Sequence, residues 1–393
     1  MASLSRNTMR PCRSARQIRN TVQTVCHQKR LLSTPTHGAA EAEVQAAQQY
    51  CMNLLAKYDR PSYTLTTFIP PTTQKAYIAL RALNSTLALL PDTTSSHTIG
   101  LMRLQFWRDA VSKTLAGSPP KEPIAILLAS ALDDLSQRTG GKGKLSKNWL
   151  NRMINAREQT LTNDPYTDLA ALEGYAESTY STLLYLTLQA MPMNSVTADH
   201  VASHIGKAAG IAAVLRGLPI VAFPGQGRQV QETGAGSAAG AGVQMGSRQG
   251  AVMLPLDIMA QTGVKEEEVF RRGAEAEGLR DAVFTVATRA SDHLITVQQM
   301  LSNLRAGGDV GHDFEHEGEE GHQYAASGLH GQEHESPLAE VNRAFGVFMP
   351  AVSTRLWLDR LEGVDFDIFR PELLRLDWKL PWKSYMAFRR KSF

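Results

Sequence analysis

Residues 76–84 read AYIALRALN and lie in a stretch whose apolar residues recur every three or four positions. The members of this stripe are Tyr77, Leu80, Leu83, Leu87 and Leu90. Such spacing places the apolar side chains on one face of an α-helix, where they pack against a core. The stretch therefore predicts a helix that faces the interior of the protein.

The same periodicity recurs elsewhere, within residues 44–55, 101–115 and 172–186. Convincing alternation with a period of two, which would indicate half-buried strands, is not apparent. Helices end where Pro or Gly interrupts the pattern. Such interruptions occur at Pro70-Pro71, Pro91, Pro119-Pro120, Gly140-Gly141, Pro192 and Pro224-Gly225. We therefore predict an all-α protein with several helices.

Two segments are low in sequence complexity. Residues 225–250 are rich in Gly, Ala, Ser and Gln, and residues 307–336 are rich in Gly, His and Glu. Neither segment can bury enough apolar surface to offset the entropy lost on ordering. We expect both to be disordered insertions in one helical domain at residues 41–380, followed by an aromatic and basic tail at residues 381–393.

The first 40 residues contain no Asp or Glu, but they contain six basic residues before residue 30 and a seventh at Arg30. Ser, Thr and small residues fill the intervals, and the arginines recur at about helical spacing. This composition is typical of an amphipathic mitochondrial transit peptide, which the membrane potential draws inward. We predict a presequence at residues 1–40, with a candidate processing site at residues 30–33. The alternative is a disordered basic tail.

Composition excludes several classes of function. The net charge of +3 is small, so binding of nucleic acid is not expected. Of the three cysteines, Cys12 and Cys26 lie in the expected presequence, which leaves only Cys51. One thiol cannot form an internal disulfide, a four-cysteine zinc site or an iron–sulfur site. The longest apolar runs, such as residues 124–132, fall short of the roughly 20 residues that span a bilayer, so we expect no integral membrane insertion.

Two segments resemble the squalene/phytoene synthase family. Residues 76–84 place Tyr77 and Arg81 in a Tyr-x-x-x-Arg pattern, and residues 205–217 read IGKAAGIAAVLRG and contain Leu215-Arg216. Further landmarks follow in the family's order over roughly residues 54–304. They include Phe106-Trp107-Arg108, residues 175–188 and Met253-Leu254-Pro255-Leu256-Asp257. The resemblance implies an isoprenoid-synthase-like helical bundle.

The resemblance also implies where catalytic carboxylates should be. Enzymes of this family ionise an allylic diphosphate with Mg²⁺ that is held by two Asp pairs at i and i+4 on facing helices. The corresponding positions here are Asn84, Ala88, Gly217 and Val221, and none is acidic. A hard divalent cation beside a polyanion needs negative charge from the protein. We therefore predict a pseudoenzyme with no catalytic residues at these positions, no metal and no cofactor.

Other family residues are retained. Tyr77, Arg81 and Arg216 persist, and two arginines can bind a phosphate or a lipid headgroup. We identify these three residues as a candidate phosphate- or lipid-binding site. The alternative is that they hold helices together through buried hydrogen bonds. Where the family usually has a small Ala-Gly pair on the helix that lines its prenyl channel, this chain has Thr179-Tyr180, and the tyrosine is expected to narrow the cavity.

One mitochondrial branch of the family lacks these aspartates and acts in the assembly of respiratory complex I. Residues 364–371, VDFDIFRP, and residues 175–186 resemble that branch. The resemblance implies a non-catalytic assembly role, with complex I assembly intermediates or other assembly factors as partners. It also implies a location on the matrix side of the inner membrane. Two alternatives remain open: an active prenyl-diphosphate transferase with an unorthodox metal site, and a prenyl-lipid-binding carrier.

The C-terminus mixes aromatic and basic residues. Its aromatic residues are Trp378, Trp382, Tyr385, Phe388 and Phe393, and its basic residues are Lys379, Lys383, Arg389, Arg390 and Lys391. This mixture suits an anionic membrane surface. We therefore predict peripheral contact with the inner membrane.

Three further motifs have simpler interpretations. Asp133 and Asp134 are adjacent, so on a helix their side chains diverge by about 100° rather than sharing a face. The histidines at 312, 316, 322, 330 and 334 could chelate a transition metal weakly, but they are interpreted as part of a solubilising tract. The glycine-rich residues 234–246 lack the Gly-Lys-Ser/Thr ending of a phosphate-binding loop and are interpreted as a spacer.

Overall fold

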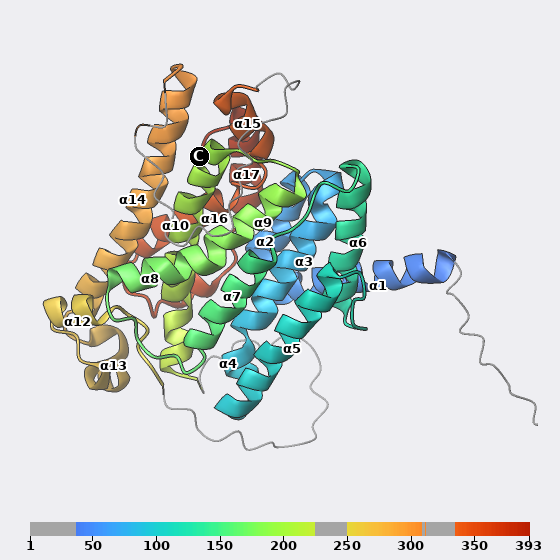
Figure 1. The fold of residues 1–393 in the computed structure, drawn as a ribbon. Helices are drawn as coiled ribbons and strands as arrows, with labels where there is room; N and C mark the ends of the chain where they lie inside the picture. The colour runs from blue at the N-terminus through green and yellow to red at the C-terminus, as the bar shows by residue number, and fades with distance from the viewer. Residues whose placement is uncertain (1–36, 225–249, 309–310, 312–334) are drawn as a thin grey trace, which may run out of the picture.

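The computed structural model describes residues 37–224, 250–308, 311 and 335–393. All regular secondary structure within these residues is helical (Figure 1), which confirms the predicted all-α class. Most of the expected presequence, nearly all of the two low-complexity segments and the five histidines of the second one lie outside the described residues. Helix α1 begins at His37, four residues before the predicted domain boundary.

The first half of the chain forms a series of helices joined by short connections. These are α1 (His37–Tyr58), α2 (Arg60–Leu65), η1 (Thr66–Phe68), α3 (Pro71–Ala88), α4 (Leu90–Thr93), α5 (His97–Leu115), α6 (Pro123–Arg138), α7 (Lys147–Gln159), α8 (Leu169–Ala176), η2 (Glu177–Ser181) and α9 (Thr182–Ala190). The second half comprises α10 (Val196–Ala222), α12 (Leu256–Thr262), α13 (Glu266–Arg272), η3 (Gly273–Glu275), α14 (Leu279–Arg305), α15 (Pro337–Ala344), α16 (Pro350–Glu362), η4 (Pro371–Leu374) and α17 (Leu380–Arg390).

Side-chain caps explain where several helices begin. The hydroxyls of Ser96, Ser146 and Ser195 accept hydrogen bonds from backbone N–H groups in the first turns of α5, α7 and α10. The carboxylate of Asp168 does the same for α8. Each cap satisfies one of the N–H groups that a helix start leaves without an intrahelical partner.

The predicted stripe on α3 is buried, with each of its apolar members at most 3% exposed. Helix α3 packs against α1, α6 and α9. The last residue of the stripe, Leu90, belongs to α4 and is also buried in the core. The helix starts at Pro71, which needs no hydrogen-bond partner at that position. The sequence interpretation of residues 76–90 is therefore confirmed.

Helix α10 is the central helix of the bundle and packs against α8, α9, η2, α14 and α16 (Figure 1). Its 27 residues contain an 18-residue window with a mean hydropathy of 1.5, so by length and composition it could cross a membrane. The expectation that every apolar stretch falls short of that length was wrong for α10. Half of that window is buried inside the bundle, so the apolar residues of α10 also serve as core.

Helix α10 approaches η2 very closely. Residues Glu177–Ser181 form a π-helical turn between α8 and α9. At Gly206 of α10, a Cβ atom would overlap the Cα and Oγ of Ser181, and at Gly210 it would meet Ala176. The hydroxyl of Ser181 donates a 3.0 Å hydrogen bond to the carbonyl of Ser203 across the same contact. Glycine at 206 is therefore required by the packing of the two elements.

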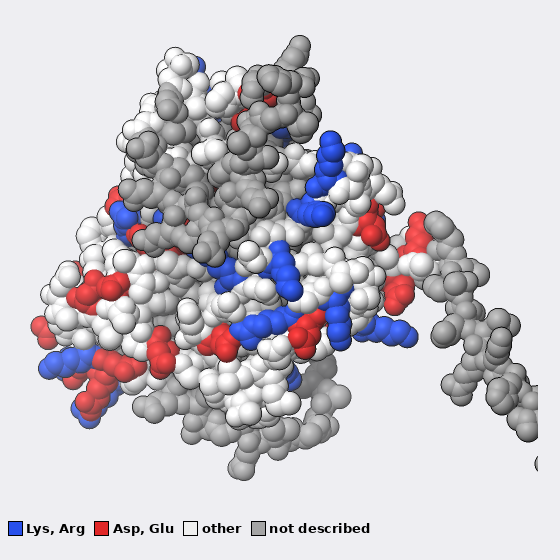
Figure 2. All heavy atoms as spheres, in the orientation of Figure 1, with Lys and Arg blue, Asp and Glu red and all other residues white. Residues whose placement is uncertain are grey.

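Basic and acidic side chains are interspersed over the face shown in Figure 2. Helix α13 provides an example, because its first turn contains three glutamates and its last turn Arg271 and Arg272. The two arginines form i,i+4 ion pairs with Glu267 and Glu268 at 2.6 and 3.2 Å. The acidic first turn complements the dipole of the helix.

Candidate functional site

Helices α3 and α10 bring most of the predicted site residues to one cavity. This site cavity has a volume of about 320 Å³, and its walls include Arg81, Asn84 and Ala88 from α3 and Arg216 and Gly217 from α10. Of the two expected pairs of metal positions, both members of the α3 pair and one member of the α10 pair therefore lie at the same hollow. Both helices thus line one hollow, but they bring no carboxylate to these positions.

An adjoining cavity of about 210 Å³ contains the fourth position, Val221. Ala88, Tyr180 and Gly217 line both hollows. Tyr180 belongs to the π-helical turn η2, a type of irregularity that is frequent at functional sites. The tyrosine that was expected to narrow the family's channel thus forms part of the wall common to the two cavities.

Arg157 of α7 reaches into the adjoining cavity and bonds directly to the first metal position. Its Nη2 donates a 2.9 Å hydrogen bond to Oδ1 of Asn84, and its Nη1 donates to the hydroxyl of Tyr175. The guanidinium also lies over the rings of Tyr175 and Tyr180, at 5.3 and 6.0 Å from their centroids. A fixed positive charge therefore occupies the surroundings of Asn84, where it repels a divalent cation.

The sequence interpretation missed Arg157, although a signal was present. Leu150, Met153 and Ile154 form the apolar stripe of α7, and Arg157 continues this stripe at the next helical position. Arg157 is only 9% exposed. A charged residue on the buried face of a helix requires partners, and the partners here come from α3, α8 and η2.

The retained residues have separate surroundings. Tyr77 is buried and is not among the residues that line the cavity, and its hydroxyl donates a hydrogen bond to the carbonyl of Ser62 at 3.2 Å. Burial raises the pKa of Tyr77, so the phenol stays protonated. The guanidinium of Arg81 lies 5.4 Å from the Tyr77 ring, and that of Arg216 lies 5.2 Å from the ring of Trp357. The hydrogen bond of Tyr77 links α3 to α2, and the contact of Arg216 with Trp357 links α10 to α16. Tyr77 and Arg81 both belong to α3, so their contact lies within one helix.

Three arginines at these hollows nevertheless have hydrogen-bonding capacity left. The Nε atoms of Arg81, Arg157 and Arg216 are buried and have no hydrogen-bond partner among the described residues. Burial lowers the pKa of Arg216, but a guanidinium remains charged at neutral pH. Buried N–H groups without a partner are costly. The arrangement is therefore suited to an anion that accepts hydrogen bonds from Arg81 and Arg216.

Acidic groups near the hollows are few. Among the described residues, Asp59 lines the site cavity and Asp92 the adjoining one, and Asp59 is engaged as the N-cap of α2. The buried carboxylate of Glu177 accepts hydrogen bonds from Tyr185 at 2.6 Å and Ser203 at 2.9 Å. No group of three His, Cys, Asp or Glu that could hold a metal ion occurs in the described part of the chain.

The Asp133-Asp134 motif lies away from these hollows. Asp134 forms an ion pair with Lys75 at 2.9 Å between α6 and α3. This position agrees with the interpretation that the two aspartates do not form a metal-binding pair.

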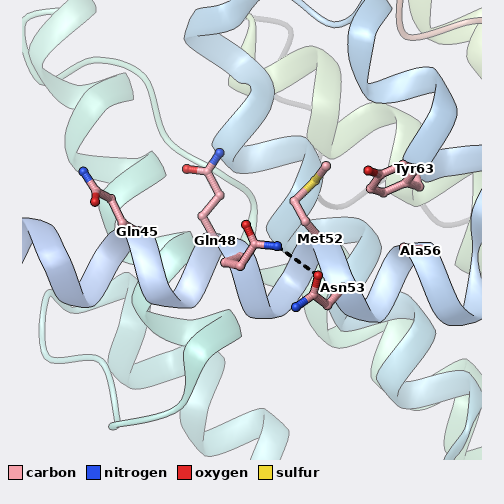
Figure 3. A pocket seen from close by; sticks show the side chains of 7 residues that line it. Gln45, Gln48, Met52, Asn53, Ala56 and Tyr63 are labelled. Carbon is pink, nitrogen blue, oxygen red and sulfur yellow. Dashed lines mark hydrogen bonds between the residues drawn. The ribbon is translucent and has the colours of Figure 1, made fainter. Parts of the chain in front are cut away.

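Another hollow lies on α1 and has a volume of about 420 Å³ (Figure 3). Amide side chains dominate its wall, and Gln49 donates a 2.9 Å hydrogen bond to Asn53 there. Tyr63 is its only titratable residue among those described. The described walls of this hollow are therefore neutral and mainly formed by amide groups.

A larger groove of about 500 Å³ lies between α2, α16 and the C-terminal residues 373–381. It shares part of its wall with the site cavity, including Arg216 and Ile220 of α10. The sequence interpretation did not predict this groove, because its walls come from residues 57–64, 216–220 and 353–381, which are far apart in the chain.

Comparison with known proteins identifies relatives of similar length. Proteins named "NADH dehydrogenase (ubiquinone) complex I, assembly factor 6" match from Rattus norvegicus at 34% identity and from Homo sapiens at 32%. Each alignment covers 88% of this chain and 82% of the relative. A Drosophila melanogaster homologue of that factor is 28% identical, over 86% of this chain and 83% of its own length. The chain is thus a homologue of complex I assembly factor 6.

Solved structures show the same fold at low sequence identity. A dehydrosqualene synthase in complex with a ligand superimposes with a TM-score of 0.59 at 12% identity, covering 90% of this chain and 98% of the other. Squalene synthase HpnC from Alicyclobacillus acidocaldarius gives a TM-score of 0.55 at 12% identity, with coverages of 83% and 96%. The predicted isoprenoid-synthase-like bundle is confirmed. The family model "Squalene/phytoene synthase" matches residues 55–228 and 242–385, and the chain therefore belongs to the squalene/phytoene synthase family.

Proposed function

We propose that this protein acts in mitochondria as a non-catalytic factor for the assembly of respiratory complex I. The relatives that are named complex I assembly factor 6 align with this protein over most of its length. Residues 1–40 contain basic residues but no Asp or Glu, and this composition supports import into mitochondria. The observation that carries the non-catalytic part is the hydrogen bond from Arg157 to Asn84, which gives one expected metal position a cationic partner.

The physical argument against catalysis is electrostatic. Ionisation of an allylic diphosphate requires divalent cations, which neutralise the charge that develops on the leaving group. Ala88, Gly217 and Val221 offer no side-chain oxygen, and the oxygen of Asn84 is neutral and already bonded. The remaining charges in the walls of the site cavity include Arg81 and Arg216, which bind an anion but cannot replace a metal cage.

An active prenyl-diphosphate transferase is the competing hypothesis, and a direct assay separates the two. The purified chain is incubated with Mg²⁺ and farnesyl or geranylgeranyl diphosphate, and products are extracted and quantified. We expect no condensation product. Product formation that is abolished by Arg81→Ala, but retained by the exposed control variant Arg271→Ala, would overturn the non-catalytic assignment.

The assembly role is tested by disruption of the gene, followed by native-gel separation of respiratory complexes. Selective loss of mature complex I, with the other complexes retained, is the expected result. Re-expression of the wild-type chain should restore complex I. Normal levels of complex I in the disrupted cells would contradict the assembly role, whatever the result of the transferase assay.

We also propose that the protein contacts the matrix face of the inner membrane as a peripheral protein. Trp378 is 82% exposed, Trp382 is 65% exposed and Tyr385 is 46% exposed. Lys379 and Lys383 lie among them in the sequence. Exposed aromatic rings beside lysines suit the boundary between headgroups and acyl chains of an anionic bilayer.

The C-terminal residues are part of the fold as well as candidates for this contact. Residues 381–393 were expected to form a tail, but residues Leu380–Arg390 form helix α17, which buries Leu380, Ser384 and Ala387. The ring of Phe388 lies 5.4 Å from that of Phe68, and Phe393 stacks on Phe345 at 4.8 Å. Truncation after Leu380 would remove these core contacts, so substitutions of exposed residues give the cleaner test.

We therefore expect Trp378→Ser together with Trp382→Ser to move the protein from the membrane fraction to the soluble matrix fraction at low salt. The wild-type protein should remain with the membrane at low salt and leave it in carbonate or high salt. Met102→Ser on α5, where the side chain is 68% exposed, is the matched control. Unchanged membrane association of the double variant would contradict this proposal.

A further inference from the structure

The groove beside the C-terminal segment has a mainly apolar wall that reaches the protein surface. Leu356 and Trp357 of α16 and Leu373 of η4 form part of the wall. Leu376 and Trp378, which are 64% and 82% exposed, form its outer edge. A volume of about 500 Å³ lies within the range of about 300–1,000 Å³ that is common for small-molecule sites.

The charged residues of the groove are nearly all basic. Lys57, Arg60, Arg216, Arg360 and Arg375 line it, together with the acidic residue Asp377. The carboxylate of Asp377 accepts a 2.8 Å hydrogen bond from the backbone N–H of Lys379. This excess of positive charge is complementary to an anionic ligand.

The groove adjoins the site cavity, and the two hollows share part of their walls. Lys57, Tyr58, Pro61, Arg216, Ile220 and Ser353 line both. An amphiphile in the groove would therefore have its apolar part along Leu356 and Leu376 and its polar end at Arg216, with Arg81 beyond it in the site cavity. The surface edge of this path contains Trp378, which is also part of the proposed membrane contact.

Two observations at the inner end point to a ligand with acceptor oxygens. Arg81 is 4% exposed and its Nε atom has no hydrogen-bond partner. The Nε atom of Arg216 is likewise buried without a partner, while the rest of its guanidinium lies over Trp357. Phosphate oxygens accept charge-assisted hydrogen bonds from guanidinium groups, often in pairs.

We infer that the groove admits a membrane amphiphile with a phosphate headgroup, which binds Arg216 and Arg81 while one hydrocarbon chain lies against Leu356, Leu373 and Leu376. Entry is headgroup first, because Arg81 and Arg216 are internal, whereas Leu376 and Trp378 are at the surface. The inference rests on the proposed membrane contact, which places the open edge of the groove at the bilayer.

The test uses the full chain and vesicles of phosphatidylcholine, with or without phosphatidic acid. Protein is mixed with vesicles, separated from them again by high salt and flotation, and analysed by native mass spectrometry. We expect about one phosphatidic acid per chain and no retained phosphatidylcholine. Inorganic phosphate, added in place of vesicles, should bind much more weakly, because it lacks the chain that fills the groove.

Variants locate the bound lipid. Arg216→Gln should lower retained phosphatidic acid by about tenfold or more, since a charged hydrogen-bond donor to the phosphate is lost. Vesicle flotation of this variant should stay near the wild-type level. Leu376→Asp changes an exposed position, so the core stays intact while the edge of the groove becomes acidic. This variant should also retain less phosphatidic acid. Arg271→Gln on α13 should change neither readout.

Lipid retention that Arg216→Gln and Leu376→Asp leave unchanged would overturn the inference, as would equal retention of phosphatidylcholine. Flotation with vesicles but no retained lipid would also overturn it, and would leave the membrane proposal standing.

If the chain does not float with vesicles at all, the membrane proposal fails. A short-chain phosphatidic acid below its micellar concentration then tests the groove alone, and absence of binding would overturn the inference. Capture of acidic peptides in preference to lipid would likewise contradict it.

Discussion

Oδ1 of Asn84 on α3 lies 2.9 Å from Nη2 of Arg157 on α7. This hydrogen bond joins the first of the expected metal positions to a buried guanidinium. A carboxylate at 84 would form an ion pair with the guanidinium, and an asparagine accepts a hydrogen bond from it. The neutral side chain at position 84 and the buried guanidinium of Arg157 therefore belong to the same local arrangement.

Arg157→Ala should destabilise the fold by about 3 kcal/mol, because it leaves polar partners unsatisfied and opens a cavity beside Tyr175 and Tyr180. Chemical denaturation followed by circular dichroism measures the free energy of unfolding. Lys147→Ala, an exposed change on the same helix, should stay within about 0.5 kcal/mol of the wild type. A loss below about 1 kcal/mol for Arg157→Ala would show that the buried contacts matter little.

Asn84→Asp should not create a magnesium site. The new carboxylate would pair with Arg157, and the other metal positions still offer no charge. We therefore expect millimolar Mg²⁺ to leave the melting temperature of this variant unchanged, as in the wild type. The double variant Asn84→Asp/Ala88→Asp is the more demanding test, because it carries carboxylates at both α3 positions. Its melting temperature should likewise not change with Mg²⁺. A magnesium-dependent rise in melting temperature for either variant would show that Arg157 does not block the site.

Gly206→Ala should destabilise the protein by about 2 kcal/mol, because the new methyl group would overlap Ser181 where α10 meets η2. The matched control is Gly174→Ala on α8, where a Cβ would meet nothing within 4 Å. Removal of that helical glycine should be stabilising by about 0.5 kcal/mol. Thermal melts of the two variants should therefore shift in opposite directions. Equal shifts would contradict the close approach.

Glu173 should make stability depend on pH in the acid range. Burial raises the pKa of this carboxyl, but hydrogen bonds from His293 and Arg289 more than offset that effect and lower the pKa from 4.5 to about 2. The folded pKa lies below the unfolded one. The contribution is therefore present above about pH 4.5 and is lost as the pH falls through about 2.

The free energy of unfolding, measured by denaturant titration between pH 5 and pH 2, should thus fall less steeply in Glu173→Gln than in the wild type. The difference has an upper bound of about 3 kcal/mol. Glu277→Gln, at an exposed position, should follow the wild-type curve. Parallel curves for Glu173→Gln and the wild type would show that the hydrogen bonds of Glu173 to His293 and Arg289 do not make stability depend on pH in this range.

The helical architecture could be predicted from the sequence because it depends on local periodicity. The stripe from Tyr77 to Leu90 is buried as expected, and the predicted breaks at Pro70-Pro71 and Pro192 lie at helix boundaries. The π-helical turn at Glu177–Ser181 could not be predicted, because an inserted residue changes the backbone hydrogen bonds without a distinct residue pattern.

The site could be predicted only in part. The meeting of Asn84, Ala88, Arg216 and Gly217 at one hollow followed from the family resemblance. Arg157 could not be assigned a role, because its partners lie on helices distant in sequence. The orientation of α17, with Trp382 exposed and Phe388 packed against Phe68, likewise depends on tertiary packing that the alternation of aromatic and basic residues does not determine.

The hydrogen bond from Arg157 to Asn84 also bears on any redesign of this scaffold. A single Asn84→Asp substitution would place the new carboxylate beside the guanidinium, where the two groups form an internal ion pair instead of a cation site. An engineered metal cage would therefore need coordinated changes on α3, α7 and α10.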